Sequence, residues 1–235
     1  MTVELLDIAK FVAVVVLGYL LGSIPVGYLI GKRQAKVDIR QQGSGRTGAT
    51  NVLRTAGRKS AALVASLDLL KGVLAVVFAG LIVSKGYLVV GSFGLGSLVA
   101  QVLAALAAVA GHIWPVFLKF RGGRGVAPFF GGLIALCPVA ALFGGEILII
   151  GAGLTRFVSL GSIAGAVGAY AILVPLTIMN GFPIEYLFYA LVGAIIILVM
   201  HRDNIRRLIS GKERKLGEKA ERKVSPSSNP TEGAG

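Results

Sequence analysis

The segment from Gly111 to Gly125 gathers three cations and three closely spaced glycines between two apolar runs of the chain. Glycine adopts positive φ freely, so this backbone is able to curl closely around a ligand. Backbone N–H groups that curl together among cations bind anions, phosphate in particular. We therefore expect a phosphate site formed by Gly122, Gly123 and Gly125 with the cations Lys119, Arg121 and Arg124.

A second glycine-rich segment runs from Gly43 to Asn51 and contains the pattern G-x-G-x-x-G. A dinucleotide site needs this pattern between a strand and a helix, but here an apolar span precedes it. A nucleotide-binding P-loop is also disfavoured, because Ala49 stands where its lysine belongs. An oxyanion site remains, with a plain flexible loop as the alternative. Its expected groups are the backbone of Gly43 and Gly45, the side chains of Ser44, Thr47, Thr50 and Asn51, and the nearby Arg46 and Arg54.

The third segment runs from His201 to Arg207. His201 and Asn204 are three residues apart, so on a helix they share one face. A histidine there is suited to orient or deprotonate a hydroxyl near neutral pH. The alternative is a basic anchor that contacts lipid headgroups.

Composition indicates which elements must position these segments. Hydrophobic residues make up 55% of the 235 residues and charged residues only 15%, whereas a soluble domain carries roughly a quarter charged residues. Apolar runs of about 20 residues, enough to cross a bilayer core of ~30 Å, recur along the chain. The first run, from about residue 8 to 30, has no small-residue cleavage site, so we expect a span rather than a signal peptide. Cys137 is the single cysteine, which excludes an intrachain disulfide and a cysteine metal cluster.

The cations are distributed unevenly and set the expected topology. Of the 24 Lys and Arg, eight lie between Lys32 and Lys59, three between Lys119 and Arg124, one at Arg156 and nine after His201. The positive-inside rule places these clusters in the cytoplasm. The sequence thus predicts an all-α, polytopic membrane protein with seven transmembrane helices, two of them short, the N-terminus outside and the C-terminus inside. The expected spans are about 8–30, 61–83, 91–110, two short helices or a re-entrant hairpin broken near Cys137-Pro138, 160–179 and 184–200.

We expect residues 1–211 to form this membrane domain and the polar residues 212–235 to form a disordered cytoplasmic tail. Ionisable residues inside spans are rare and need a reason. Asp68 and Lys71 lie three residues apart on one span; an ion pair that supports the site is the first interpretation, and a direct phosphate-ligand role for Lys71 is the second. Glu146 is expected to be a structural carboxyl that faces the bundle or is protonated, and His112 to be structural.

Seven segments, taken in order, form a recognisable set: Gly22-Ser-Ile-Pro-Val-Gly-Tyr, Asp38-Ile-Arg, Gly43-Ser-Gly…Gly48-Ala-Thr-Asn51-Val, Asp68-Leu-Leu-Lys-Gly72, Gly111-His…Pro115-Val-Phe…Gly122-Gly-Arg-Gly-Val126, Arg156-Phe-Val-Ser-Leu160 and His201-Arg-Asp-Asn-Ile205. With these motifs the sequence resembles the bacterial acyl-phosphate:glycerol-3-phosphate acyltransferases, the PlsY family, over about residues 18–213. The resemblance implies seven spans, a bacterial inner-membrane location, a site that faces the cytoplasm, and synthesis of lysophosphatidate as the first step of phospholipid synthesis.

The family's motifs carry over residue by residue. Ser44, beside Asn51, matches the serine of the first motif, and His201 and Asn204 match the third. The loop that the family uses for glycerol phosphate is matched by Gly122, Gly123, Arg124 and Gly125, and its structural glutamate by Glu213. Three positions depart from the family pattern: Arg46 stands where Asn is common, Arg124 where Lys is common, and Asp203 where Glu is usual.

The resemblance implies a reaction in which the 1-hydroxyl of glycerol 3-phosphate attacks the carbonyl of an acyl phosphate and inorganic phosphate leaves. The expected catalytic residues are Ser44, His201 and Asn204, with either His201 or the acyl phosphate as the proton acceptor. The expected phosphate-binding residues are Gly43, Gly45, Asn51, Lys71 and the loop from Gly122 to Gly125.

We expect no cofactor and no metal, and membrane topology explains the net charge of +13 better than binding of nucleic acid does. Membrane lipid is an expected partner, and the enzyme that makes acyl phosphate is a further one. An anion channel or transporter with Arg-lined cytoplasmic loops is the alternative. That alternative predicts cations through the whole depth of the bundle, whereas nearly all of them fall on one side.

Overall fold

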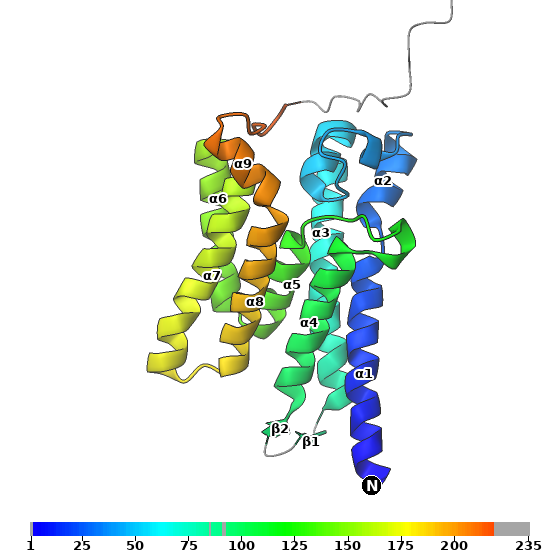
Figure 1. The fold of residues 1–235 in the computed structure, drawn as a ribbon, viewed down its shortest axis with the longest axis vertical. Coiled ribbons are helices and arrows are strands. Elements are labelled where there is room, and N and C mark those ends of the chain that lie inside the picture. Colours follow the sequence, from blue (N-terminus) through cyan, green and yellow to red (C-terminus); the bar gives the residue numbers. More distant parts are fainter. Residues whose placement is uncertain (1, 85, 91–92, 219–235) are drawn as a thin grey trace, which may run out of the picture.

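A computed structural model describes residues 2–84, 86–90 and 93–218, most of which are helical (Figure 1). The α-helices are α1 (Thr2–Ser23), α2 (Val26–Gln34), α3 (Ala49–Val83), α4 (Ser97–Ile113), α5 (Val126–Leu136), α6 (Pro138–Thr155), α7 (Val158–Asn180), α8 (Ile184–Met200) and α9 (Arg202–Ile209). The 3-10 helices are η1 (Ile39–Gln41) and η2 (Val116–Leu118), and the strands are β1 (Leu88–Val90) and β2 (Phe93–Leu95).

Helix lengths support a multi-pass membrane protein. Among the described residues, five helical segments are long and apolar enough to cross a bilayer, and the α8–α9 pair, bent by 59°, makes a sixth. Helix α5 has only 11 residues, which is too short to cross alone. The chain does break at Cys137-Pro138 between α5 and α6, as expected. The count of seven spans depends on α5 and stays a prediction.

Two element boundaries differ from the sequence-based expectation. The third span begins at Ser97 instead of about residue 91, because β1 and β2 pair as an antiparallel hairpin with Val89 opposite Gly94. Two short apolar runs separated by the dipeptide Gly-Ser are a sequence pattern typical of paired strands, and apart from this short pair the regular structure of the described residues is helical, as expected. The second span extends back to Ala49, and Gly57 gives it a kink at φ 82°.

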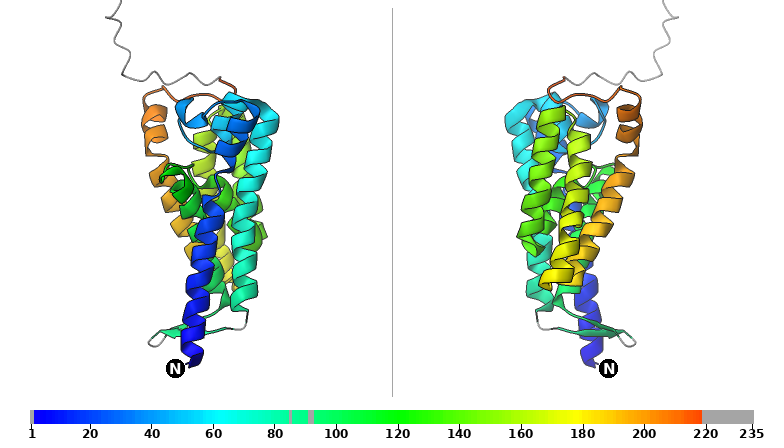
Figure 2. Two further views of the ribbon diagram at one scale, coloured as in Figure 1. Left: turned by 90° about the vertical axis from the view of Figure 1, so that its right-hand side faces the viewer. Right: turned by 90° about the vertical axis from the view of Figure 1, so that its left-hand side faces the viewer.

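The helices form two groups, which Figures 1 and 2 show from three sides. Helices α1, α3 and α4 pack together, α6 and α8 pack on either side of α7, and the short α5 contacts both α3 and α6. Backbone meets backbone where α5 contacts α3, since a Cβ on Gly72 would lie 2.1 Å from the carbonyl oxygen of Pro128. Close approach through small residues is how membrane helices associate, and here it fixes the start of α5.

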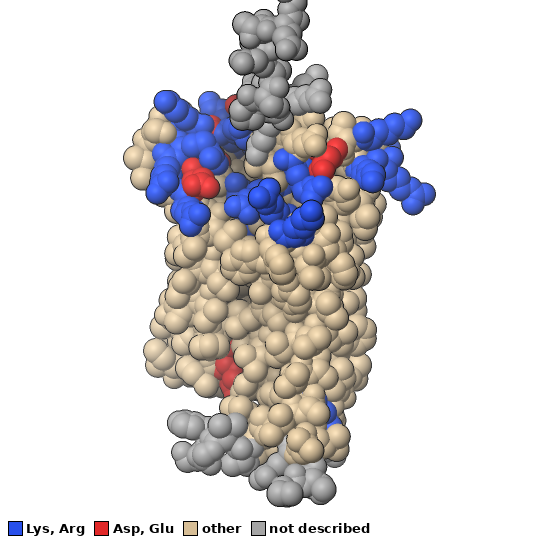
Figure 3. Space-filling model, turned by 45° about the vertical axis from the view of Figure 1, so that its right-hand side comes forward, with Lys and Arg blue, Asp and Glu red and all other residues tan. Residues whose placement is uncertain are grey.

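Charge is concentrated at one end of the molecule. Figure 3 shows Lys and Arg around the end that carries α2, α9 and the loops, above a broad band with few charges. The N-terminus lies at the opposite end (Figure 2). Glu146 corrects an expectation, because its side chain is exposed on the outer surface of α6 and does not face the bundle. Gly144, two residues earlier, occupies the packed side of α6 and touches α7.

The predicted orientation is testable with reporters at the two ends. A reporter fused after Gly235 should be active on the cytoplasmic side and a tag before Thr2 should be accessible from outside, because the charged end is retained in the cytoplasm. Accessibility of each tag in intact and lysed cells measures this. Two ends on the same side of the membrane would reject the seven-span topology.

Candidate active site

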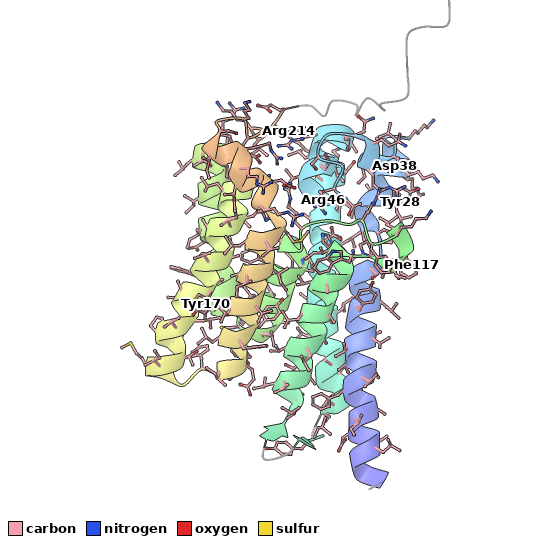
Figure 4. The ribbon with its side chains drawn as sticks, viewed as in Figure 1. Tyr28, Asp38, Arg46, Phe117, Tyr170 and Arg214 are labelled. Carbon is pink, nitrogen blue, oxygen red and sulfur yellow. The ribbon has the colours of Figure 1, made fainter. Side chains whose placement is uncertain are left out.

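A cavity of about 510 Å³ opens at the charged end, between the two helix groups. Loops before α3 and α5 and the α8–α9 break supply its polar lining, and α3, α5 and α6 supply an apolar one. Arg46 and Arg214, labelled in Figure 4, lie at this end of the molecule. Of the residues predicted for the site, the cavity is lined by Ser44, Asn51, Gly123, Arg124, His201 and Asn204, and not by Gly43, Gly45, Lys71, Gly122 or Gly125.

Asn51 organises the first glycine-rich loop. Its buried amide nitrogen donates to the carbonyl oxygens of Ile39 and Arg46, both at 2.9 Å, and of Gln42 at 3.1 Å. Its amide oxygen accepts the N–H of Ser44 at 3.1 Å. These three acceptors take up both N–H groups of the amide, so a positioning role fits Asn51 better than its predicted role as a phosphate ligand. The loop it holds presents the hydroxyl of Ser44 to the cavity.

The second glycine loop corrects another expectation. The N–H of Gly122 donates to Ile113 and that of Gly123 to His112, each at 3.0 Å. These two N–H groups therefore complete the C-terminal turn of α4, and they do not form the expected nest for an anion. Both glycines are needed for close packing instead, since a Cβ on Gly123 would lie 2.0 Å from Nε2 of His112.

Gly125 turns the loop into α5. Its φ of 83° is in the left-handed region that favours glycine, and Val126 and Ala127 then line the cavity in the first turn of the helix. First-turn N–H groups have no partner within their helix and attract anions. The backbone N–H groups of this loop that are available to an anion thus lie just after the glycines that the sequence singled out.

Arg124 is the cation best placed to bind an anion. Its Nε is buried without a hydrogen-bond partner. Burial and the neighbouring charge of Arg46 lower the pKa of Arg124 to about 10, so the guanidinium remains charged at neutral pH. An unpaired guanidinium offers charge-assisted hydrogen bonds to an oxyanion. Within the described part of the chain, five arginines line the cavity: Arg46, Arg54, Arg124, Arg207 and Arg214.

His201 and Asn204 meet in the cavity, as their spacing predicted. His201, at the break between α8 and α9, is 2% exposed, and its Nδ1 lies 2.8 Å from the carbonyl oxygen of Ile197. This contact fixes the tautomer with hydrogen on Nδ1 and leaves Nε2 as an acceptor. Burial, together with the charge of Arg124, lowers the pKa of His201 to about 4. The imidazole is therefore neutral at physiological pH.

Glu213 joins three segments of the site. One carboxylate oxygen accepts hydrogen bonds from Asn204 at 2.6 Å and Ser159 at 2.8 Å, and the other accepts from Arg207 at 2.8 Å. Burial alone would raise the pKa of Glu213, but these donors hold it below its usual value. Because the amide nitrogen of Asn204 is held this way, its oxygen, buried without a partner, is free to accept a substrate hydroxyl.

The expected tail does not begin at residue 212. The N–H of Leu216 donates to the carbonyl of Arg156 at 2.7 Å, and Arg54 donates to the carbonyls of Arg214 and Lys215. Residues 212–218, which we call the strap, thus cross the mouth of the cavity between α3 and the α6–α7 turn. Residues 219–235 lie outside the described part of the chain, so disorder there stays a prediction.

Sequence reasoning missed Ser159, Ser162, Arg207 and Arg214 as cavity-lining residues. Ser159 lies inside the segment from Arg156 to Leu160, which belongs to the family motifs, and this was the available signal. Arg207, on α9, and Arg214, in the strap, belong to a basic cluster and carry no signal that distinguishes them from surface cations.

Lys71 forms the expected ion pair. Its Nζ donates to Oδ1 of Asp68 at 2.6 Å and to the carbonyl of Ile24 at 2.5 Å, in the break between α1 and α2. His112 completes the group, with Nδ1 at 3.6 Å from the same carboxylate oxygen. Asp68 and His112 line the cavity but Lys71 does not. The ammonium is thus committed to helix contacts, and its assignment as a phosphate ligand is not supported.

Comparison with known proteins identifies the family of the chain. A model of the glycerol-3-phosphate acyltransferase family matches residues 12–211. The chain belongs to this family. "Glycerol-3-phosphate acyltransferase 3" of Dehalococcoides mccartyi strain CBDB1 is 69% identical over 213 residues, which are 91% of this chain and 99% of that protein. The glycerol-3-phosphate acyltransferase of Halalkalibacterium halodurans is 43% identical, over 86% of this chain and 94% of that protein.

A solved structure is also similar. The crystal structure of PlsY, described as an integral membrane glycerol 3-phosphate acyltransferase in its glycerol 3-phosphate form, superposes with a TM-score of 0.76 at 36% identity. The match covers 88% of this chain and 96% of that protein. A second structure of PlsY, in the lysophosphatidic acid form, gives a TM-score of 0.74. The membrane fold of the acyltransferase is therefore shared.

We predict how the acyltransferase responds to pH through His201. Because the lowered pKa keeps His201 neutral above about pH 5, the ratio of kcat/KM between wild type and His201→Ala should stay constant from pH 6 to 9. A histidine with an ordinary pKa near 6.5 would lose about fourfold in this ratio between pH 8 and 6. Such a loss would contradict the neutral, buried imidazole.

The role of Lys71 is testable with a paired substitution. Lys71→Met leaves the buried carboxylate of Asp68 without its ammonium partner and should destabilise the enzyme by about 3–5 kcal/mol. The double variant Asp68→Leu/Lys71→Met should recover most of the thermal stability measured in detergent, because both charges are gone. KM for glycerol 3-phosphate is measured in both variants. If the double variant recovers its stability but KM is raised equally in both, Lys71 is a phosphate ligand after all.

Proposed function

We propose that this chain transfers a fatty acyl group from an acyl phosphate to the 1-hydroxyl of glycerol 3-phosphate, giving lysophosphatidate and inorganic phosphate. Membership of the glycerol-3-phosphate acyltransferase family supports the acceptor and the reaction type. The observation that carries the proposal is one cavity with an arginine-rich end and an apolar end. Such a cavity suits substrates in which a phosphate and an acyl chain meet at the reacting carbonyl.

The polar end of the cavity is suited to bind two phosphate groups. Acyl phosphate and glycerol 3-phosphate are both anions and repel each other, so cations must hold them side by side. Five arginines with two carboxylates, Asp68 and Glu213, line the cavity, and Glu213 is already neutralised by Arg207. Holding two reactants in contact converts a bimolecular step into an effectively unimolecular one. The first turn of α5 adds backbone N–H donors beside Arg124.

The apolar end of the cavity is suited to bind the acyl chain. Below the polar mouth the lining consists of aliphatic and aromatic side chains from three helices, including Leu69 of α3, Phe130 of α5 and Leu148 of α6. Burial of methylene groups there is favourable by about 0.8 kcal/mol each. An acyl phosphate bound this way has its chain among the helices and its phosphate among the arginines.

The chemistry follows from the groups around the junction. The 1-hydroxyl oxygen forms a bond to the acyl carbon, the bond from that carbon to the phosphate oxygen breaks, and inorganic phosphate leaves. In the proposed mechanism the free oxygen of Asn204 and Nε2 of His201 are the acceptors for the hydroxyl hydrogen and orient the attack. The proton passes to His201 or to the departing phosphate, and a pKa near 4 for His201 favours the phosphate. Arg124 and Ser44 stabilise charge on the phosphate and on the carbonyl oxygen.

The positions of the cations along the helix bundle disfavour an anion channel or transporter. Among the described residues, cavity-lining arginines come from α3, the polar loops, α9 and the strap, all at the charged end. Lys71, deeper in the bundle, is paired with Asp68. A selectivity pathway would need cations further down the bundle. We propose in addition that the enzyme lies in a bacterial inner membrane, with its site facing the cytoplasm and open to the enzyme that makes acyl phosphate.

The proposed donor is testable with purified protein. Acyl phosphate should support lysophosphatidate formation and acyl-CoA should not, because a thioester has no phosphate beside its carbonyl for the arginines to hold. Inorganic phosphate should inhibit in competition with acyl phosphate. Lysophosphatidate is measured by mass spectrometry, with His201→Ala as the low-activity control. Efficient transfer from acyl-CoA that is insensitive to phosphate would reject the proposed donor and leave the family assignment intact.

A further inference from the structure

Helix α6 contributes one wall of the apolar end of the cavity. It runs from Pro138, away from the charged end, to Thr155 beside Arg156 at the mouth (Figure 1). Its residues that line the cavity lie on three successive turns, and they are Ala141, Gly145 and the adjacent pair Leu148 and Ile149. Gly145 is the smallest of them and lies in the deeper half of this wall.

The space in front of Gly145 is empty. A Cβ built on Gly145 would meet no atom within 4 Å. The adjacent Gly144 is different, because its Cβ would lie 2.6 Å from the carbonyl oxygen of Gly165 on α7. Packing between α6 and α7 thus requires a glycine at 144 but not at 145. The volume left by the missing side chain of Gly145 belongs to the cavity.

The position of Gly145 matters for a chain that descends the groove. From Ile149 to Gly145 the helix rises about 6 Å, and Ala141 lies about 6 Å further from the mouth. Ile134 of α5 lines the same deep part. An acyl chain whose carbonyl sits at the arginines must therefore pass Gly145 before its end reaches Ala141 and Ile134.

We propose that Gly145 determines the length of acyl chain that the enzyme accepts, by leaving the groove open past the middle of α6. This inference rests on the proposed function, because it requires the acyl chain to occupy the apolar end of the cavity. A side chain at position 145 would close the lower groove without touching the arginines. Chains that end above it would bind as before, and longer chains would be excluded.

The test is a graded series at Gly145 with a control on the same helix. Gly145→Val and Gly145→Phe add increasing bulk in the groove. Gly153→Phe adds the same bulk at an exposed position of α6, where a Cβ also meets no atom within 4 Å and which does not line the cavity. Each purified variant is assayed with decanoyl, lauroyl, palmitoyl and stearoyl phosphate, and KM for glycerol 3-phosphate is measured with the shortest donor.

The ratio of kcat/KM for stearoyl to decanoyl phosphate should fall by about tenfold or more in Gly145→Phe, because an apolar pocket discriminates at this level for small changes in chain size. The fall should be smaller in Gly145→Val and absent in Gly153→Phe. KM for glycerol 3-phosphate should not change. If Gly145→Phe does not fold, the Val variant still decides through the same ratio.

Two results would overturn the inference. An unchanged chain-length ratio in folded Gly145 variants would mean that the acyl chain leaves the groove toward the lipid above this residue. An equal loss of activity for all chain lengths, with a raised KM for glycerol 3-phosphate, would make Gly145 a structural residue. Failure of the proposed function is distinguishable, because wild-type enzyme would then form no lysophosphatidate from any of the four acyl phosphates.

Discussion

Repulsion among arginines is the constraint around which this molecule is built. The cavity needs cations that are unpaired and close together, so their mutual repulsion must be opposed by the rest of the fold. Glu213 offsets part of it by pairing with Arg207, and backbone carbonyls of the strap accept from Arg54. Arg124 is left with a free Nε. An anion bound in the cavity thus neutralises positive charge that the protein's own carboxylates leave uncompensated.

Close helix packing through glycine provides the rigidity that holds these cations in place. The cations must be held on a rigid frame inside a bilayer, where apolar side chains gain nothing by leaving lipid for each other. Gly18, Gly22 and Gly111 lie where α1 and α4 touch through their backbones, and Gly72 and Gly131 do the same for α3 and α5. Close backbone contact replaces the hydrophobic effect as the source of rigidity. The same contacts position the loop from His112 to Gly125 beside the cavity.

The sequence was sufficient to predict which segments meet and insufficient to predict what each polar group does. Spans ending on one side bring His201, Asn204 and Ser44 together, and charge distribution shows that side. Gly122 and Gly123 were expected to bind phosphate through their N–H groups, but composition does not distinguish glycine needed for conformation from glycine needed for packing. Asn51 was misassigned for a similar reason, since a buried amide that shapes a loop and one that binds a ligand have the same identity and spacing.

The strap was the least predictable part, because apart from those of Glu213 its contacts are made by backbone groups, which every residue has. Its position has a practical consequence for protein production. Shortening the chain at residue 211, where composition suggests the folded part stops, would remove Glu213 and leave Ser159, Asn204 and Arg207 without their shared acceptor. A shortened enzyme for crystallisation should therefore end no earlier than residue 218, because the strap supplies Glu213 and Arg214 to the lining of the cavity.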